Sequence, residues 1–213
     1  MGGKGGRSRI MATVDILIPA AGSSRRMAGR DKLLETVGGV EQLRRVAAMA
    51  ASFAFDHGSH VHVTIPATGP FNPARKRALM GLRVAILALP DAHEGMAASL
   101  RAGAWAARDA EGLLVLPADM PEIDRADLDR MTAVFGEDSH YPLRATTEDG
   151  APGHPVIFPR RLLGELMVLS GDQGGRAVLR DEEVRTCPLA GQRARVDLDT
   201  QEDWENWRAR TGN

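Results

Sequence analysis

Apolar runs the length of a strand alternate, up to about residue 135, with stretches whose apolar residues recur at helical spacing. The strand-like runs are Val14–Ala21, His60–Pro66, Leu82–Leu89 and Gly112–Pro117. The helix-like stretches are Val40–Phe55, Pro73–Met80, a small-residue helix through Ser99–Asp109, and Arg125–Phe135. This alternation predicts βα units that feed a mainly parallel sheet.

The pattern then changes. Tyr141–Thr147 and Val156–Pro159 predict two antiparallel strands joined at the turn signal Asp149-Gly150. The elements predicted after them are helices Arg160–Leu169 and Gly174–Asp181, a strand near Val184–Leu189, and a final helix Glu202–Arg210. We expect the antiparallel pair to lie as an insertion over the carboxyl edge of the sheet, where open α/β sheets bind ligands.

No repeat, long linker or low-complexity segment divides the chain. The sequence therefore predicts a single domain over residues 12–213, after a flexible, basic and Gly-rich leader over residues 1–11. A chain of 213 residues suits one α/β domain with a substantial buried core.

Charge and composition exclude several classes of protein. The formal net charge of -1 provides no basic field to hold a nucleic-acid backbone. The apolar runs are too short for a membrane span, and no secretory apolar core follows the leader. Cys187, the single cysteine, can form neither an internal disulfide nor a paired zinc site. We expect a cytoplasmic protein without a nucleic-acid or membrane partner.

Small residues and cations follow the first predicted strand. The small residues, which let the backbone turn sharply and approach a ligand, are Ala20, Ala21, Gly22, Ser23 and Ser24. Arg25, Arg26 and Lys32 come next, and Lys32 is one of three lysines against 24 arginines. The segment has neither the GxxxxGK[ST] nor the GxGxxG pattern. A plain strand-to-helix turn explains the glycine, but three neighbouring cations repel one another unless an anion lies between them, which favours a phosphate-binding loop.

A carboxylate, Asp119, lies just beyond the fourth predicted strand, between Pro117 and Pro121. Such a carboxylate suits Mg²⁺, which takes one or two carboxylates and completes its octahedron with water and substrate phosphates. The alternative role, capping the next helix, fits Asp124 better. Asp119 is therefore a predicted metal ligand.

Asp197 and Asp199 are two positions apart and share one face of an extended segment. Either is a candidate second ligand, while Asp199 or Thr200 is equally a candidate cap for the last helix. His60 and His62 also share a strand face, but no matching ligand lies near them in the sequence. We predict that these histidines are surface or partly buried strand residues.

No serine, cysteine or histidine arrangement suggests a covalent nucleophile. His154, beside Pro155, either contacts a ligand or fills a tight corner, and the sequence leaves both readings open. A phosphate acceptor needs no nucleophile from the protein, because a phosphate monoester is largely a dianion at neutral pH. Together these features favour metal-dependent transfer of a nucleoside monophosphate from an NTP to a phosphorylated acceptor.

The segment AAGSSRRM with Lys32 resembles the signature AAGxSxRMG…K of MocA-like molybdenum cofactor cytidylyltransferases and the related MobA-like NTP transferases. The resemblance continues in order through EGMAASLRAG (Glu94–Gly103), LPADMP (Leu116–Pro121), GHPVIF (Gly153–Phe158), GDQGGRAVL (Gly171–Leu179) and DLDTQEDW (Asp197–Trp204). It covers the chain from about Val14 to about Arg210.

This resemblance implies an α/β, Rossmann-like three-layer nucleotidyltransferase fold with a mixed, mainly parallel sheet and an antiparallel insertion. It implies that Mg²⁺ is the cofactor and that CMP passes from CTP to the terminal phosphate of molybdopterin, with a molybdoenzyme as a possible partner. The alternatives are a transferase that uses GTP, a sugar phosphate or another phosphorylated acceptor, and a non-catalytic molybdoenzyme maturation partner. The intact Lys32 and Asp119 argue against the non-catalytic alternative.

The same resemblance assigns roles to individual residues. The expected catalytic residues are Arg26, Lys32 and Asp119. The expected nucleotide-binding residues are Ala20, Ala21, Gly22, Ser23, Ser24, Arg25 and Ser99. The expected metal ligands are Asp119 and Asp197, and the expected acceptor-binding residues are His154, Gly174 and Arg176.

The chain departs from the family pattern at Ala28, where the family has glycine, and Gly29 follows one position later. The RDK ending of the loop resembles the guanylyltransferase relatives. Ala21-Gly22 and the segment GMAASL, however, differ from theirs and favour cytidine. Asp197 separates the chain from methylerythritol-phosphate cytidylyltransferases, which have a lysine near this position.

Overall fold

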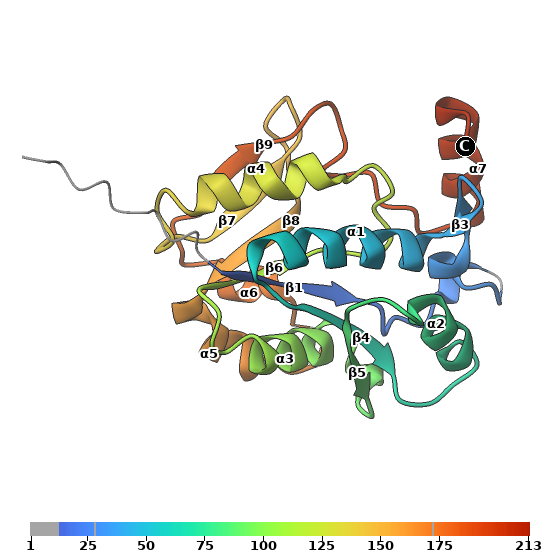
Figure 1. Ribbon diagram of the computed structural model, residues 1–213, viewed down its shortest axis with the longest axis horizontal. Helices are drawn as coiled ribbons and strands as arrows, with labels where there is room; N and C mark the ends of the chain where they lie inside the picture. The colour runs from blue at the N-terminus through green and yellow to red at the C-terminus, as the bar shows by residue number, and fades with distance from the viewer. Residues whose placement is uncertain (1–12, 28, 172) are drawn as a thin grey trace, which may run out of the picture.

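A seven-stranded sheet lies at the centre of the molecule, with helices on both faces (Figure 1). Its strands are, in spatial order, β5 (Ala85–Leu89), β4 (Val61–Pro66), β1 (Val14–Pro19), β6 (Gly112–Val115), β8 (Pro152–Pro159), β7 (Leu143–Thr146) and β9 (Arg185–Pro188). Strands β5, β4, β1 and β6 are parallel, β8 is antiparallel to β6 and β7, and β9 is parallel to β7. The predicted mixed, mainly parallel sheet is confirmed.

The structure is a computed structural model that describes residues 13–27, 29–171 and 173–213. The expected leader, residues 1–11, and the departure at Ala28 lie outside the described residues. Within these ranges, no helix has the length and apolar character that crossing a membrane requires.

The two faces of the sheet carry separate apolar cores, because successive residues of a strand point to opposite faces. On β1, Ile16 and Ile18 pack into one core while Leu17 packs into the other. The first core is covered by α1 (Gln42–His57), α2 (Asn72–Leu79) and α4 (Arg125–Phe135). The second is covered by α3 (Met96–Ala106), α5 (Leu163–Met167) and α6 (Gly175–Val178). The result is three layers, helices–sheet–helices.

The antiparallel pair is present, but its expected position over the carboxyl edge of the sheet was wrong. Strand β8 pairs directly with β6, from Gly112 opposite Pro159 to Val115 opposite Val156. Val156 and Phe158 pack into one core and Ile157 into the other. A strand that is apolar on both faces is stabilised inside a sheet rather than above it, so the pair extends the sheet beyond β6.

Several predicted boundaries differ from the observed ones. Helix α4 has the predicted bounds, and Asp124 caps it in a reciprocal pair with Asp127. The predicted helix over 160–169 is a 3-10 turn, η4 (Arg160–Leu162), followed by the short α5, and α6 is shorter than expected. Residues ahead of α1 form a small hairpin, β2 (Thr36–Val37) and β3 (Val40–Glu41), around Gly38 and Gly39 in left-handed conformation.

The C-terminal helix α7 (Gln201–Thr211) packs on the loop that follows β1. Trp204 and Trp207 form a small apolar cluster with Met27 of that loop, Val37 of β2 and Leu198. The N-cap is Thr200, whose side chain accepts a hydrogen bond from the backbone of Asp203. In Figure 1, α7 lies beside β3, on the side toward which the β1 arrow points. The segment that carries Asp197 and Asp199 therefore returns to the carboxyl end of β1.

Candidate functional site

A pocket of about 630 Å³ opens where loops leave the carboxyl ends of β1, β4 and β5. Six of the residues predicted for the nucleotide and catalytic sites line it: Ala21, Gly22, Ser23, Ser24, Arg26 and Lys32. The other lining residues are Pro66, Thr68, Gly69, Pro70, Phe71, Ala92, His93, Gly95 and Asp199. We call this pocket the loop pocket.

The ammonium group of Lys32 lies between two carboxylates at the edge of the loop pocket. Its Nζ donates to Asp119 Oδ2 at 2.5 Å and to Asp199 Oδ1 at 2.6 Å. Arg26 Nη2 contacts the other oxygen of Asp199 at 2.8 Å, and the Arg26 side chain is 70% exposed. The structure thus brings together the lysine after β1, the carboxylate after β6 and a carboxylate before α7.

The carboxylates determine the charge state of Lys32. Burial alone would lower the pKa of its ammonium group, but the charge of Asp119 and the hydrogen bonds to Asp119 and Asp199 outweigh burial and raise it. Lys32 is therefore a fixed cation at neutral pH. It can neutralise an anion and cannot act as a general base.

Asp197 lies near the same group without an ion pair of its own in the described part of the chain. Partial burial raises the pKa of its carboxyl group, and the negative charge of Asp119 raises it further. Two carboxylates that repel each other suit a divalent cation, whose charge offsets the repulsion. Among the described residues no three His, Cys, Asp or Glu side chains gather into a metal-binding group. The donor set fits a cation that takes two carboxylates and completes its coordination with phosphates and water.

A buried ion pair fixes the conformation of the small-residue loop. Asp31 and Arg75 are almost completely buried and paired twice, Nε to Oδ2 at 2.7 Å and Nη2 to Oδ1 at 2.8 Å. Ser24, whose φ is 48°, donates to Asp31 Oδ1 at 2.9 Å. A non-glycine residue in left-handed conformation costs free energy and persists where its surroundings hold it, often at a binding site. The pair thus holds the turn that presents Ser23 and Ser24 to the pocket.

Sequence reasoning missed both Arg75 and Asp31. The sequence around Arg75 does not indicate an ion pair, because its partner Asp31 is 44 positions away. Arg75 also donates to the carbonyl of Ala20 at 2.6 Å, which ties the end of β1 to α2. The one sequence feature that could have indicated Asp31 is its position directly before Lys32 in the RDK segment, where an aspartate can cap a turn. In the structure Asp31 accepts from the backbone N–H of Leu33 and caps the turn that carries Lys32.

Two predicted nucleotide-binding residues lie beneath the pocket surface. The N–H of Ala20 donates to the backbone of Thr64 at 2.9 Å, within the sheet. Ser99 is 2% exposed and accepts a hydrogen bond from the Thr64 hydroxyl at 3.0 Å. Neither lines the loop pocket, whereas Gly95, at the start of the same helix as Ser99, does. For Arg25 the structure describes no side-chain position.

The predicted acceptor side is centred on His154 of β8. Burial lowers the pKa of its imidazole, the charges of Arg144 and Arg176 lower it further, and Asp119 acts in the opposite direction. Its buried Nδ1 has no hydrogen-bond partner among the described residues. His154 is therefore a neutral ring within electrostatic reach of Asp119 and of two arginines. Gly174 precedes α6 in extended conformation, so it carries the chain into the helix of Arg176.

Close backbone packing fixes the position of His154. Its N–H donates to the carbonyl of Ala194 at 2.8 Å. A Cβ on the preceding Gly153 would lie 2.0 Å from that same carbonyl oxygen, so only glycine allows the approach. The strand β8 is thereby held against the segment that leads to Asp197.

Comparison with protein families and solved structures adds an independent finding. The profile of the MobA-like NTP transferase domain matches residues 16–187. No curated protein sequence matches the chain.

Three solved structures resemble it along most of their length. The Rv0371c homologue from Mycobacterium sp. strain JC1 is 27% identical, with a TM-score of 0.76 over 92% of this chain and 96% of that one. Rv0371c of Mycobacterium tuberculosis H37Rv in complex with manganese is 26% identical, with a TM-score of 0.71 over 91% and 97%. Molybdopterin-guanine dinucleotide biosynthesis protein A from Archaeoglobus fulgidus is 15% identical, with a TM-score of 0.66 over 93% and 98%, and shares the fold.

Proposed function

Because the chain belongs to the family of MobA-like NTP transferase domains, we propose that it is a nucleotidyltransferase that moves CMP from CTP to the terminal phosphate of molybdopterin. An oxygen of the acceptor phosphate attacks the α-phosphorus of the NTP. The bond from the α-phosphorus to the oxygen that bridges it to the β-phosphorus breaks, and pyrophosphate leaves with that oxygen. Nucleotidyl transfer is the reaction class of the family, and the choice of CTP and molybdopterin is our proposal.

The observation that supports the proposal most strongly is that the side chains of Lys32, Arg26 and Asp119 lie close together beside the loop pocket. The small-residue turn offers its backbone to a triphosphate, while Lys32 and Arg26 neutralise its charge. At ~4 Å and an effective dielectric constant of ~20, each cation–phosphate pair is worth about 4 kcal/mol before desolvation. Charge that increases at the phosphates as pyrophosphate leaves is stabilised by the same side chains.

For the metal we propose Mg²⁺, held by Asp119 and Asp197. Bound there, a divalent cation would neutralise phosphate charge next to Lys32. The mutual repulsion of these two carboxylates supports this assignment over Asp199, whose oxygens are already paired with Lys32 and Arg26. The manganese complex of Rv0371c, 26% identical to this chain, supports a divalent cation in general.

We place the acceptor beside His154, Gly174 and Arg176. The neutral His154 ring can orient the acceptor by a hydrogen bond, and Arg176 can hold negative charge. A phosphate dianion needs no proton removed before it attacks, so the reaction needs orientation and neutralisation from the protein and no general base. The absence of a nucleophile pattern in the sequence agrees with this direct transfer.

The base preference for cytidine rests on sequence. Ala21-Gly22 and GMAASL match the cytidylyl relatives better than the guanylyl relatives, as described above. Ser99 is buried behind the loop pocket, so any effect it has on base or ribose passes through Thr64 and the loop. We also propose that residues 12–213 act as one cytoplasmic domain that delivers its product to a molybdoenzyme.

A test is to incubate the protein with Mg²⁺, molybdate-loaded molybdopterin and each NTP separately, and to measure pyrophosphate release. We expect release with CTP and at least tenfold less with GTP, in proportion to a binding difference of about 1.4 kcal/mol. No release with CTP would defeat the proposal. Release with GTP alone, or with a sugar phosphate in place of molybdopterin, would replace our choice of nucleotide or acceptor.

A further inference from the structure

A second pocket, of about 390 Å³, lies between the outer strands of the sheet and α6. Its lining residues are Arg144, Pro152, Arg176, Leu179, Arg180, Val184 and Thr186, and none of them lines the loop pocket. Arg144 of β7 lies opposite Thr186 of β9 in the parallel register, and α6 carries Arg176 over them. We call it the arginine pocket.

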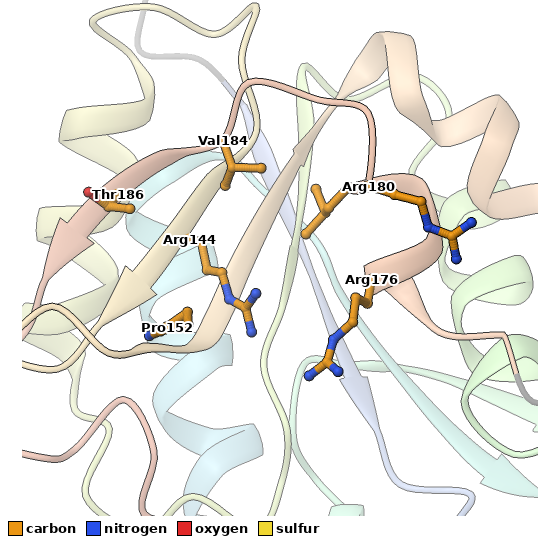
Figure 2. A pocket seen from close by; sticks show the side chains of 7 residues that line it. Arg144, Pro152, Arg176, Arg180, Val184 and Thr186 are labelled. Carbon is orange, nitrogen blue, oxygen red and sulfur yellow. The ribbon is translucent and has the colours of Figure 1, made fainter.

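Two guanidinium groups share this pocket. Figure 2 shows those of Arg144 and Arg176 near each other, whereas the side chain of Arg180 ends away from both. Burial lowers the pKa of Arg144, and the charge of Arg176 lowers it further, which places the two cations within electrostatic reach. Arg144 is partly buried and Arg176 is exposed, and their like charges repel each other.

No carboxylate compensates either cation among the residues that the structure describes. Arg144 donates Nε to a neutral acceptor, the carbonyl of Gly153, at 3.0 Å. Two other partly buried arginines are paired, Arg101 with Glu94 and Arg193 with Asp127, whereas the partly buried Arg144 is not paired with a carboxylate among the described residues. Guanidinium groups bind the oxygens of phosphate-class anions in a fork geometry, and a bound oxyanion would remove the repulsion between Arg144 and Arg176.

The arginine pocket adjoins the acceptor side of the proposed active site. Pro152 of β8 lines this pocket. His154 is two residues further along β8, and the charges of Arg144, Arg176 and Asp119 all affect the pKa of its imidazole. His154 therefore links the two regions, because its neighbour Gly153 accepts from Arg144 Nε and its imidazole lies within electrostatic reach of Asp119. A molecule whose phosphate reaches the Asp119 side could extend past His154 into the arginine pocket.

We infer that Arg144 and Arg176 bind a second, phosphate-class oxyanion at the far end of the acceptor. This inference rests on the proposed function, since it assigns the attacking phosphate to the Asp119 side. It narrows the substrate class to acceptors with anionic groups at both ends. Arg144 then selects for the second group, and Arg176 orients it.

The test uses inorganic phosphate as the probe and calorimetry as the measurement. The protein is first saturated with Mg²⁺ and a non-hydrolysable CTP analogue, which fills the loop pocket, and phosphate is then titrated. Binding of the CTP analogue tests the proposed function separately. A protein that does not bind the analogue would therefore be distinguished from one that binds the analogue but not phosphate. We expect wild-type protein to bind phosphate, and Arg144→Gln and Arg176→Gln to bind it at least about tenfold more weakly.

Two further variants control for fold and for general loss of charge. Arg144→Lys keeps the charge without the fork and should bind with intermediate affinity. Arg83→Gln removes an arginine that lies over the Phe55 ring and should bind phosphate as the wild type does. Absence of phosphate binding by the saturated wild type would overturn the inference. Equal affinity of Arg144→Gln, Arg176→Gln and wild type would overturn it as well.

Discussion

Lys32 joins parts of the chain that are far apart in sequence. It follows β1, yet it contacts Asp119 after β6 and Asp199 before α7. The scarcity of lysine among the basic residues and the position of Lys32 after a small-residue turn made it a candidate site residue in the sequence. Asp119 was a candidate because the carboxyl ends of parallel strands share one edge of the sheet, and the structure brings the two side chains into contact while their catalytic roles stay a prediction.

Other residues of the site could not be identified in this way. The sequence left Asp197 and Asp199 equivalent, because spacing places both on one face but does not say which one a cation will contact. The structure separates them, since Asp199 pairs with Lys32 and Arg26. Nothing in the sequence indicated Arg144 as a binding residue. Its proximity to Arg176 becomes visible only in the structure, where α6 packs over the outer strands.

Replacing Lys32 with Ala should reduce kcat by about 10²–10³-fold, as for other side chains that stabilise transition-state charge. The matched control is Lys76→Ala, which removes an exposed lysine of α2. Steady-state pyrophosphate release measures both variants. A loss from Lys76→Ala equal to that from Lys32→Ala would show that the wrong lysine had been identified.

Replacing Asp119 or Asp197 with Asn should raise the Mg²⁺ concentration needed for half-maximal activity, because each removes one anionic ligand. Thermal unfolding without metal should stay close to wild type for Asp197→Asn, whose carboxylate has no ion pair among the described residues. A titration of activity with Mg²⁺ measures the effect. An unchanged metal requirement in Asp197→Asn, with an increased one in Asp199→Asn, would move the second ligand to Asp199.

At the scale of elements, the loop after β1 is held from two sides. Helix α2 holds it through Arg75 and Asp31, and α7 holds it through the cluster of Trp204, Trp207 and Met27. Local sequence predicts each helix but not these tertiary contacts, because each contact joins residues far apart in the chain. The loop geometry therefore depends on elements that carry no reacting group.

Replacing Arg75 with Met should lower the free energy of unfolding by about 3–5 kcal/mol, because it leaves the buried carboxylate of Asp31 without its cationic partner. Urea unfolding measures the loss. The control, Arg77→Met on the same helix, breaks an exposed pair with Glu41 at 3.9 Å and should change the unfolding free energy by less than about 1 kcal/mol. Equal, small losses for both would contradict the positioning role of Arg75.

A second contact between elements ties β1 to β4. Asp15 accepts from His62 Nε2 at 3.1 Å and from the backbone of His60 at 2.9 Å. His60 is exposed, as predicted, whereas His62 is buried more completely than the predicted surface or partly buried position. Burial would raise the pKa of Asp15, but the hydrogen bond from His62 and the further interactions lower it overall.

A carboxyl group with a lowered pKa stabilises the fold above its unfolded-state pKa of about 3.9 and loses this effect as the pH falls through the lower folded-state value. We therefore expect Asp15→Asn to be less stable than wild type at pH 5–7 and the difference to shrink below about pH 4. Denaturant unfolding over this pH range tests it, with the exposed Asp109→Asn as the control. A difference that grows on acidification would contradict the assignment.

At the scale of the whole molecule, hydrophobic periodicity was sufficient for the fold class. Strands buried on both faces and helices with one apolar face specify a layered α/β structure wherever the pattern is regular. The order of strands beyond β6 could not be predicted from the sequence. The apolar run of β8 is compatible both with a strand added to the sheet and with an insertion that covers the sheet edge. The family match and the similar solved structures agree with the observed fold.

The central claim is that the cations after β1 and the carboxylates after β6 and before α7 form one site for an NTP and a divalent cation. Calorimetric titration of CTP into the protein, with and without Mg²⁺, tests it most directly. We predict that Mg²⁺ increases the affinity for CTP by at least about tenfold, and that Asp119→Asn loses this increase. Equal CTP affinity with and without Mg²⁺ in the wild type would contradict the claim.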